Sequence, residues 1–267
     1  IAEKAQAAGK TPKEFVDENV EHWKKFFQQL NISNDRFIRT TDKAHEDRAA
    51  IIWKNLEKDI YLGKYTGWYC VGCEEYKTDT YVKETAGNCP NHNRPYDKLE
   101  EENYFFKLSE YAKPILEAIE KGDMKIIPES RKAEIVNVLK DGLEDISISR
   151  PKGKLDWGIA VPGDKNQVMY VWLEALMNYI TTIGYPEHAD FKDFWPANLQ
   201  VIGKDILRFH AAIWPAMLLG LKLPLPTHLL VHGFVTSDGQ KMSKSLGNVI
   251  DPIGLIDEFG TDAFRYY

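Results

Sequence analysis

All three cysteines of the chain, together with one histidine, fall into two short knuckles. Cys70 and Cys73 form one Cys-x2-Cys pair, and Cys89 and His92 form a second pair beyond residues 74–88. Three thiolates and one imidazole satisfy the tetrahedral coordination of Zn²⁺ and leave no open position for a substrate. Three unrelated buried cysteines are the alternative, but they would have no reason to share one pattern. The spacing therefore predicts a structural zinc site.

Two lysines, Lys241 and Lys244, lie three positions apart among small hydroxyl residues. The preceding Asp238-Gly239 is a tight-turn signal, so two short strands could present the lysines on a mobile loop. Two ammonium groups suit an anionic polyphosphate, although a solvated basic loop explains such a pair equally well. The chain has no Gly-rich Walker loop and no G-x-G-x-x-G turn, so a bound nucleotide would have to be held in another way.

A third group of residues forms two helical stripes. Trp172, Ala175 and Tyr179 are spaced i, i+3, i+7, and Ile206 and His210 are spaced i, i+4. Each set shares one helix face. Facing stripes of this kind would form an apolar slot lined by aromatic and aliphatic side chains. On residue types alone, ordinary core packing explains the same stripes.

The elements that position these residues follow from capping signals and periodicity. Thr11-Pro12-Lys13-Glu14 predicts a capping box at the start of a helix that ends near Leu30. A second amphipathic helix is expected over 42–58. Glycines and prolines then break the pattern, which indicates an inserted, loop-rich module. Within it we expect short strands, helices near 109–121 and 129–139, and a closing strand at 146–148.

Beyond residue 156 the pattern alternates between strand and helix. We expect strand 167–171 to lead into helix 172–183, strand 199–202 to lead into helix 205–219, and strand 229–231 to follow. This alternation predicts an α/β fold with a parallel sheet. Ligands of such sheets bind at the carboxyl ends of the strands, which draws attention to Gly203, Asp205 and His232.

Composition excludes several classes of protein. Apolar residues make up 43% of the chain and charged residues 28%, which is typical of a folded globular chain. No apolar run approaches the roughly 20 residues of a membrane span, and no signal peptide opens the sequence, so we expect a soluble, cytoplasmic protein with no membrane partner. A net charge of −6 argues against nonspecific duplex binding.

Several ordered segments resemble one known family. Lys241-Met242-Ser243-Lys244-Ser245 is similar to the second signature of class I aminoacyl-tRNA synthetases, and the surrounding sequence resembles the methionyl-tRNA synthetase family in particular. The resemblance spans nearly the whole chain. It is carried by Trp68-Tyr69-Cys70, by the segments 102–106, 170–176 and 202–206, by Phe209-His210 and by Trp214-Pro215-Ala216.

The resemblance implies an activity and a set of partners. The reaction would be ATP-dependent activation of methionine to methionyl adenylate, with Mg²⁺ accompanying ATP, followed by transfer to the 3′ end of tRNA(Met). The implied fold is a Rossmann-like sheet, from 1–62 and 150–231, split by a zinc-binding connective-peptide insertion at 63–149. Residues 232–267 would form the KMSKS loop and the start of the stem-contact region.

The resemblance also implies roles for single residues. The methionine pocket would contain Trp172, Ala175, Tyr179, Ile206 and His210. The ATP site would contain Gly203, Asp205, His232, Val235 and Lys244, and the catalytic pair would be Lys241 and Lys244.

One departure and two rival interpretations accompany this resemblance. The family's first signature, His-x-Gly-His, does not occur in the chain. We therefore expect these residues to lack the opening strand, loop and helix of the catalytic domain and the helical anticodon-binding domain, and by themselves to form little adenylate. A leucyl or valyl enzyme would need a larger editing insertion. A zinc-ribbon nucleic-acid-binding module would need a basic face around Cys70–His92, where Glu74, Glu75, Asp79 and Glu84 lie instead.

Overall fold

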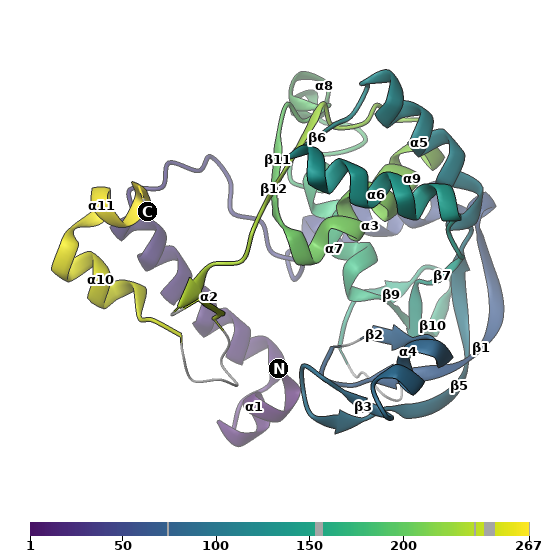
Figure 1. The fold of residues 1–267 in the computed structure, drawn as a ribbon, viewed down its shortest axis with the longest axis horizontal. Helices are drawn as coiled ribbons and strands as arrows, with labels where there is room; N and C mark the ends of the chain where they lie inside the picture. Colours follow the sequence, from purple (N-terminus) through teal and green to yellow (C-terminus); the bar gives the residue numbers. More distant parts are fainter. Residues whose placement is uncertain (74, 153–156, 238, 243–248, 267) are drawn as a thin grey trace. The chain divides into compact units, whose positions relative to one another are not determined.

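The structure, a computed structural model, describes residues 1–73, 75–152, 157–237, 239–242 and 249–266. The chain divides into two compact units (Figure 1). One unit comprises Ile1–Phe37 and Val235–Tyr267, and the other comprises Ile38–Phe234.

The first unit is mainly helical and joins the two ends of the chain. Its elements are α1 (Ala2–Ala7), α2 (Pro12–Gln29), the hairpin of β13 (Thr236–Ser237) and β14 (Gln240–Lys241), α10 (Pro252–Phe259) and α11 (Thr261–Tyr266). The Arg265 guanidinium donates hydrogen bonds to the carbonyls of Leu30 at 3.0 Å and Asn31 at 3.1 Å. The rings of Phe26 and Phe264 meet edge to face at 6.4 Å. Side-chain packing and these caps therefore hold α11 against the end of α2.

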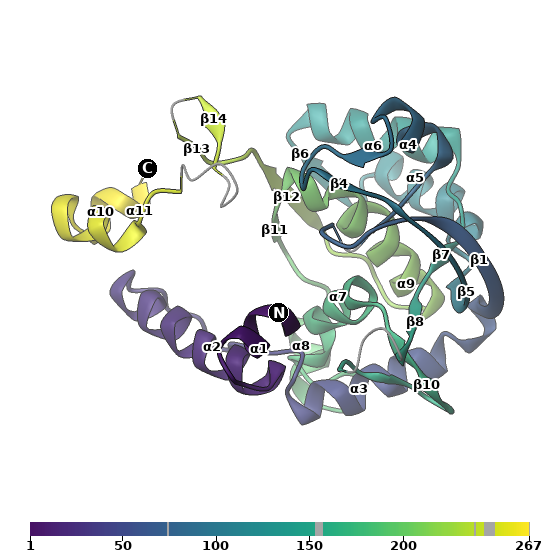
Figure 2. The same ribbon diagram turned by 90° about the horizontal axis from the view of Figure 1, so that it is seen from below.

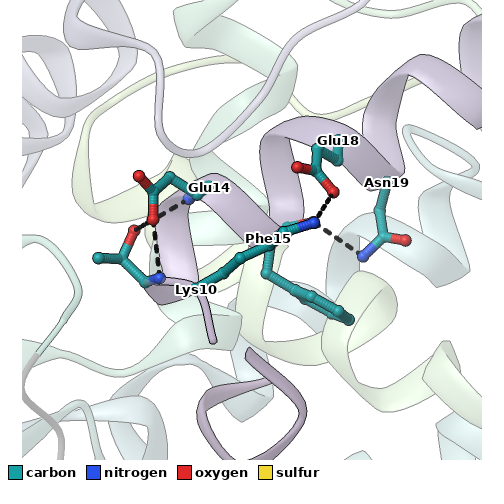
Figure 3. A network of polar contacts seen from close by, with 6 residues as sticks. Lys10, Glu14, Phe15, Glu18 and Asn19 are labelled. Atoms are coloured by element: carbon teal, nitrogen blue, oxygen red, sulfur yellow. Dashed lines mark hydrogen bonds and ion pairs between the residues drawn. The ribbon is translucent and has the colours of Figure 1, made fainter. Parts of the chain in front are cut away.

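The predicted start of α2 is confirmed. Thr11 Oγ1 accepts a hydrogen bond from the Glu14 N–H at 3.2 Å, and Glu14 Oε2 accepts one from the Thr11 N–H at 2.9 Å. Farther along α2, Glu18 forms an ion pair with Lys10, which precedes the helix, and Asn19 Nδ2 donates to the Phe15 carbonyl at 2.9 Å (Figure 3). The two capping-box hydrogen bonds satisfy backbone N–H groups that the start of a helix otherwise leaves without partners.

A three-stranded parallel sheet organises the second unit. Its order is β11 (Gln200–Gly203), β12 (His228–His232) and β6 (Lys125–Ile127) (Figure 1). The chain crosses from β11 to β12 through the 3-10 turn η4 (Lys204–Ile206), a π-helical segment (Phe209–Ile213) and α9 (Trp214–Gly220). Parallel neighbours need such a crossover. The predicted strands at 199–202 and 229–231 and the helical connection between them are confirmed.

Helices pack on the buried side of this sheet. They are α3 (Lys43–Asn55), α5 (Ala112–Lys121), α6 (Glu129–Asp141), α7 (Val171–Thr181) and α9. A short helix, α8 (Ala189–Phe194), lies between α7 and β11 in the sequence. Their apolar faces and Ile202, Leu229 and Val231 form the main hydrophobic core. The helices predicted over 42–58, 109–121, 129–139 and 172–183 are confirmed, with ends displaced by up to three residues. Among the described residues, no helix combines the length and apolar character of a membrane span.

A four-stranded antiparallel sheet accounts for much of the chain between α3 and α7. Its order is β2 (Glu75–Lys77), β1 (Ile60–Cys70), β5 (Asp97–Phe106) and β7 (Ile146–Ser147), and the long pair β1 and β5 curves along one side of the unit (Figure 2). Short elements complete the region, namely η1 (Glu57–Asp59), α4 (Asp79–Glu84), β3 (Asn88–Cys89), β4 (Arg94–Pro95) and η2 (Leu108–Tyr111).

Strand β1 is longer than the short strands expected from the sequence. The strand continues through Gly63. Glycine is needed there for space, because a Cβ would lie 3.2 Å from the Phe105 ring. That ring stacks on Tyr61 at 5.5 Å. Glycine within a strand often marks such a close approach rather than an end.

The strand predicted at 167–171 exists, but its expected place in the parallel sheet is wrong. It is β10 (Asp164–Met169), which pairs antiparallel with β8 (Ser149–Pro151) and β9 (Ala160–Val161). Pro162 and Gly163 separate β9 from β10, and Gly163 has a φ of +85°. A two-residue turn can join only antiparallel strands.

The range expected for the insertion, 63–149, also contributes to the parallel sheet. Strand β6 lies within that range, yet its residues pair in parallel with β12 from His228 to Leu230. Residues 125–127 therefore belong to the parallel sheet, although they lie inside the range expected for the insertion.

Candidate functional site

Helix α7 presents one half-buried side next to the segment that follows β11. Trp172, Ala175 and Tyr179 are each partly exposed, whereas Leu173, Leu176 and Met177 on its other sides are buried. Apolar residues surround most of the helix because it packs in the core, and the half-buried stripe is one of its more exposed sides. The structure thus places the three residues predicted from the i, i+3, i+7 spacing on one side of one helix.

The first aromatic contact of this site joins α7 to the π-helical segment. The rings of Trp172 and Phe209 are stacked, with their centroids 4.1 Å apart and their planes 20° apart. Phe209 was not among the residues predicted for the pocket. Its position directly before His210 was the available signal.

The second contact is a chain of hydrogen bonds through a buried histidine. The Tyr179 hydroxyl lies 2.8 Å from His210 Nε2, and His210 Nδ1 lies 3.0 Å from the Ile206 carbonyl. Because a carbonyl oxygen only accepts, Nδ1 carries the proton and Nε2 accepts from Tyr179. Burial lowers the pKa of His210 and raises the pKa of Tyr179. Both side chains are therefore neutral near pH 7, and this wall of the site is uncharged.

A local backbone feature places Phe209 and His210. Residues Phe209–Ile213 form a π-helical turn, directly followed by Trp214 and Pro215 at the start of α9. Proline has no N–H and its ring crowds the carbonyl four residues earlier, here that of Ala211. A wider turn removes this conflict, and such turns occur frequently at functional sites.

A second group of predicted residues meets at the carboxyl ends of two parallel strands. Gly203 ends β11 and His232 ends β12, and the two are paired in register. A Cβ on Gly203 would lie 2.7 Å from Asp205 Oδ1 and 3.7 Å from His232 Cε1. Glycine at this position therefore leaves room between a carboxylate and an imidazole. His232 is exposed, and its Nδ1 lies 2.8 Å from the Gly233 carbonyl.

The two groups adjoin through η4. Gly203 precedes this turn and Ile206 ends it, so three residues connect the strand end to the carbonyl that accepts from His210. An uncharged aromatic wall and a polar strand end thus lie on consecutive parts of one crossover connection.

The remaining predicted residues belong to the other unit. Val235 is exposed and its carbonyl accepts a hydrogen bond from the Met242 N–H at 3.3 Å. Lys241 pairs with Thr236 in the β13–β14 hairpin. The strands predicted on either side of Gly239 are present, and Gly239 has a φ of +75°. Lys244 lies outside the described residues.

The four predicted zinc ligands come together at the tips of two short hairpins. Their ligand atoms all lie within 4.8 Å of one another. Cys73 Sγ is 3.4 Å from Cys89 Sγ and 3.4 Å from His92 Nδ1, and Cys89 Sγ is 3.6 Å from the same nitrogen. Zinc-to-ligand bonds of about 2.0–2.3 Å in a tetrahedron require separations of about 3.4–3.8 Å. The donor set and its spacing therefore fit one tetrahedral ion.

The two hairpins explain why these residues converge. Cys70 ends β1 and pairs with Glu75 of β2, which leaves Cys73 in the connecting turn. Cys89 ends β3, and the Cys89 carbonyl accepts from the Asn93 N–H at 2.8 Å, which closes the turn that carries His92. Gly72 completes the fit, because a Cβ there would lie 2.5 Å from His92 Cγ.

The ionisation of the thiols depends on their neighbours. Burial raises the pKa of Cys73 to about 12. Burial also opposes ionisation of Cys89, but hydrogen bonds from His92, Cys70 and Cys73 outweigh it and lower the pKa of Cys89 to about 6. Without a cation, the first thiolate to form thus makes a second one costly. A bound divalent cation removes this conflict because it stabilises every thiolate.

In open α/β sheets, ligands bind at the carboxyl ends of the parallel strands, which is where Gly203 and His232 lie beside the aromatic wall. The chain belongs to the family described as tRNA synthetases class I (M), which matches residues 1–100 and 92–267. Methionine–tRNA ligase of Caldanaerobacter subterraneus subsp. tengcongensis is 47% identical, over 98% of this chain and 41% of that protein. The same enzyme of Brucella melitensis biotype 1 is 45% identical, over 100% of this chain and 52% of that protein.

A solved relative agrees in fold as well as in sequence. Mycobacterium tuberculosis methionyl-tRNA synthetase, in complex with methionyl-adenylate, superimposes with a TM-score of 0.92 and is 40% identical. The match covers 100% of this chain and 53% of that protein. The chain thus spans about half the length of the relatives it matches.

Proposed function

We propose that the protein is a methionine–tRNA ligase, which activates methionine with ATP and transfers the methionyl group to the 3′ end of tRNA(Met) in the cytoplasm. The observation that carries this proposal is the uncharged pocket wall of Trp172, Tyr179 and His210 beside the strand end at Gly203. Membership of the class I (M) family and a relative solved with methionyl-adenylate support the same activity.

The methionine side chain would lie against α7 and the π-helical segment. Stacked Trp172 and Phe209 offer ring faces and edges, against which a thioether gains about 0.3–1.5 kcal/mol per contact. Both ring nitrogens of His210 already have partners, so the histidine offers no spare hydrogen bond to a charged or amide side chain. An apolar, polarizable side chain is favoured over a polar one of similar length.

ATP, with its Mg²⁺, would bind at the carboxyl ends of β11 and β12. Gly203 leaves space for close approach of a ligand, and Asp205 and His232 supply polar groups beside it. In the first step a methionine carboxylate oxygen attacks the α-phosphorus, the bond to the β-phosphate oxygen breaks, and pyrophosphate leaves. Lys241 and Lys244 would stabilise the negative charge that collects on the phosphoryl oxygens. In the second step a terminal hydroxyl of the tRNA attacks the methionyl carbonyl, and AMP leaves.

Zinc would have a structural role. Cys70, Cys73, Cys89 and His92 provide a complete tetrahedral set with no open position. The ion would hold together the tips of two hairpins in the region that resembles a connective peptide. It would take no part in the transfer reactions.

Methionine-dependent exchange of labelled pyrophosphate into ATP tests the proposal. The full-length protein should catalyse exchange with methionine and not with leucine or valine. Trp172→Ala should raise the KM for methionine. Lys244→Ala should lower the exchange rate by about 10²–10³, as expected for loss of one transition-state donor. Exchange that is supported equally by leucine would instead favour a synthetase of different specificity, and absence of exchange with every amino acid would contradict the proposal.

A further inference from the structure

Helix α7 is held from the side opposite the pocket by a buried histidine of α3. His45 Nε2 lies 3.0 Å from Glu174 Oε2, and His45 Nδ1 lies 2.8 Å from Thr181 Oγ1. The exposed fractions of the three residues are 1%, 8% and 0%. His45 is separated from both partners by more than a hundred positions in sequence, so this contact exists only in the folded chain.

The two partners of His45 lie on the side of α7 that faces away from the pocket wall. Glu174 and Thr181 are seven residues apart, which is about two helical turns, so they lie on one side of the helix. At about 100° per residue, this side lies well away from the half-buried stripe of Trp172 and Tyr179. A single imidazole thus fixes two turns of α7 from behind the pocket wall.

The remainder of α3 extends the same attachment. The Arg48 guanidinium donates to the carbonyl of Thr181, the last residue of α7, at 3.2 Å. Asn55 Nδ2 donates to the Tyr185 hydroxyl at 3.3 Å, just beyond the helix. Apolar packing alone permits a helix to slide or rotate slightly, whereas buried directional contacts at several points define one arrangement.

We propose that His45 is a positioning residue for the side-chain pocket: through Glu174 and Thr181 it sets the rotation and height of α7, and hence the placement of Trp172 and Tyr179. The inference deepens the proposed function and rests on it for the identity of the ligand. His45 itself does not contact the substrate. Its loss should misplace the pocket wall rather than remove any part of it.

The test measures methionine affinity, ATP affinity and thermal stability of the full-length protein in parallel. His45→Ala should raise the Kd for methionine about tenfold, since a displaced aromatic wall loses packing contacts with the side chain of the ligand, with little change in the Kd for ATP. His45→Gln should restore most of the affinity, because its amide can donate to Glu174 and accept from Thr181. His188→Ala is the matched control. His188 accepts from the Asp190 N–H and caps α8, so its loss should lower stability without changing methionine affinity.

A double-mutant cycle and hydrogen exchange complete the design. If His45 acts through Thr181, the effects of His45→Ala and Thr181→Val on methionine Kd should be less than additive. Amides of α7 should also exchange faster in His45→Ala than in His188→Ala. If the unaltered protein does not bind methionine, the proposed function fails and the exchange of α7 alone decides the positioning role. Unchanged methionine Kd in His45→Ala, additive effects in the cycle, or α7 exchange equal to that of the control would each overturn the inference.

Discussion

At the cysteine cluster, Gly72 is required for a reason that appears only in the folded chain. Gly72 lies beside the His92 ring, where a Cβ would approach Cγ to 2.5 Å. Gly72→Ala should therefore displace the imidazole and weaken zinc binding by about tenfold or more, within the range seen when ligand support is lost. Gly254→Ala is the control, because the nearest atom to a Cβ there is 3.8 Å away. Competition with a chromophoric chelator measures both, and equal affinities would contradict the prediction.

The thiols also predict how zinc affinity depends on pH. Zinc binds thiolates, so binding must release the proton of Cys73, whose pKa is raised to about 12 by burial. The pKa of Cys89 is lowered to about 6, so below that pH the proton of Cys89 also competes with the metal. Affinity should therefore fall as pH falls, by about tenfold per unit for each proton released, and more steeply below about pH 6. A flat profile in chelator competition between pH 5 and 8 would contradict it.

The Tyr179 hydroxyl contributes to the stability of the fold, and this contribution can be measured separately from ligand binding. Tyr179→Phe removes the donor to His210 Nε2, and His210 is only 4% exposed. An unsatisfied buried acceptor costs about 1–3 kcal/mol, which urea unfolding should detect. Tyr61→Phe is the matched control, since the Tyr61 hydroxyl donates to Asp145 at 3.0 Å from an exposed position. Similar losses in the two variants would show that the His210 contact has no special cost.

At the scale of elements, the start of α2 offers a direct test of the capping box. Thr11→Ala removes both the acceptor of the Glu14 N–H and a hydroxyl that donates to Glu14 Oε2 at 2.7 Å. Loss of such a cap costs about 1 kcal/mol, which corresponds to about fivefold faster amide exchange in the first turns of α2. Lys13→Ala, which removes only an exposed ion pair with Asp17, should change exchange much less. Unaltered exchange in Thr11→Ala would contradict the assigned cap.

The elements also show which parts of the fold the sequence could predict. Helix starts such as Thr11 and the knuckle spacing of Cys70 and Cys73 depend on residues close in sequence, so their patterns are readable. The strand–helix alternation does not predict the antiparallel place of β10, which depends on the short turn at Pro162-Gly163 and on pairing with β8. Strand β6 pairs with β12 across about a hundred residues, and no local pattern predicts such a partner.

The residues of the candidate site also fall into those that the sequence predicts and those that it does not. Helical spacing placed Trp172 and Tyr179 on one face because the period of an α-helix is regular. It could not predict the stacking of Phe209, which depends on a π-helical turn, nor the contact of His45 with Glu174, which joins two distant helices. Residues of the first kind depend on one element, and residues of the second kind depend on how elements pack.

At the scale of the whole molecule, the described residues contain two separate hydrophobic cores within the larger unit. The small one consists of Cys70, Val82, Cys89 and Tyr96, with Trp68, Cys73 and Tyr81 around it. This small core buries too little apolar surface to be stable by itself. We therefore expect the metal to supply much of the stability of this region. Chelation should accelerate hydrogen exchange in residues 68–96 and leave α7 and α9 protected. Loss of protection in all elements at once would contradict this separation.

The π-helical turn at Phe209–Ile213 has one further consequence. A π turn contains one residue more than an α turn, and the two alanines within it, Ala211 and Ala212, are buried. Exchanging either for another small residue leaves the backbone path unchanged. Deleting one would let the chain continue as an α-helix and would rotate Phe209 and His210 by about 100° relative to α9. The pocket therefore tolerates exchange of these two alanines for other small residues but not their deletion, and single-residue deletions will reveal this dependence on the length of the segment.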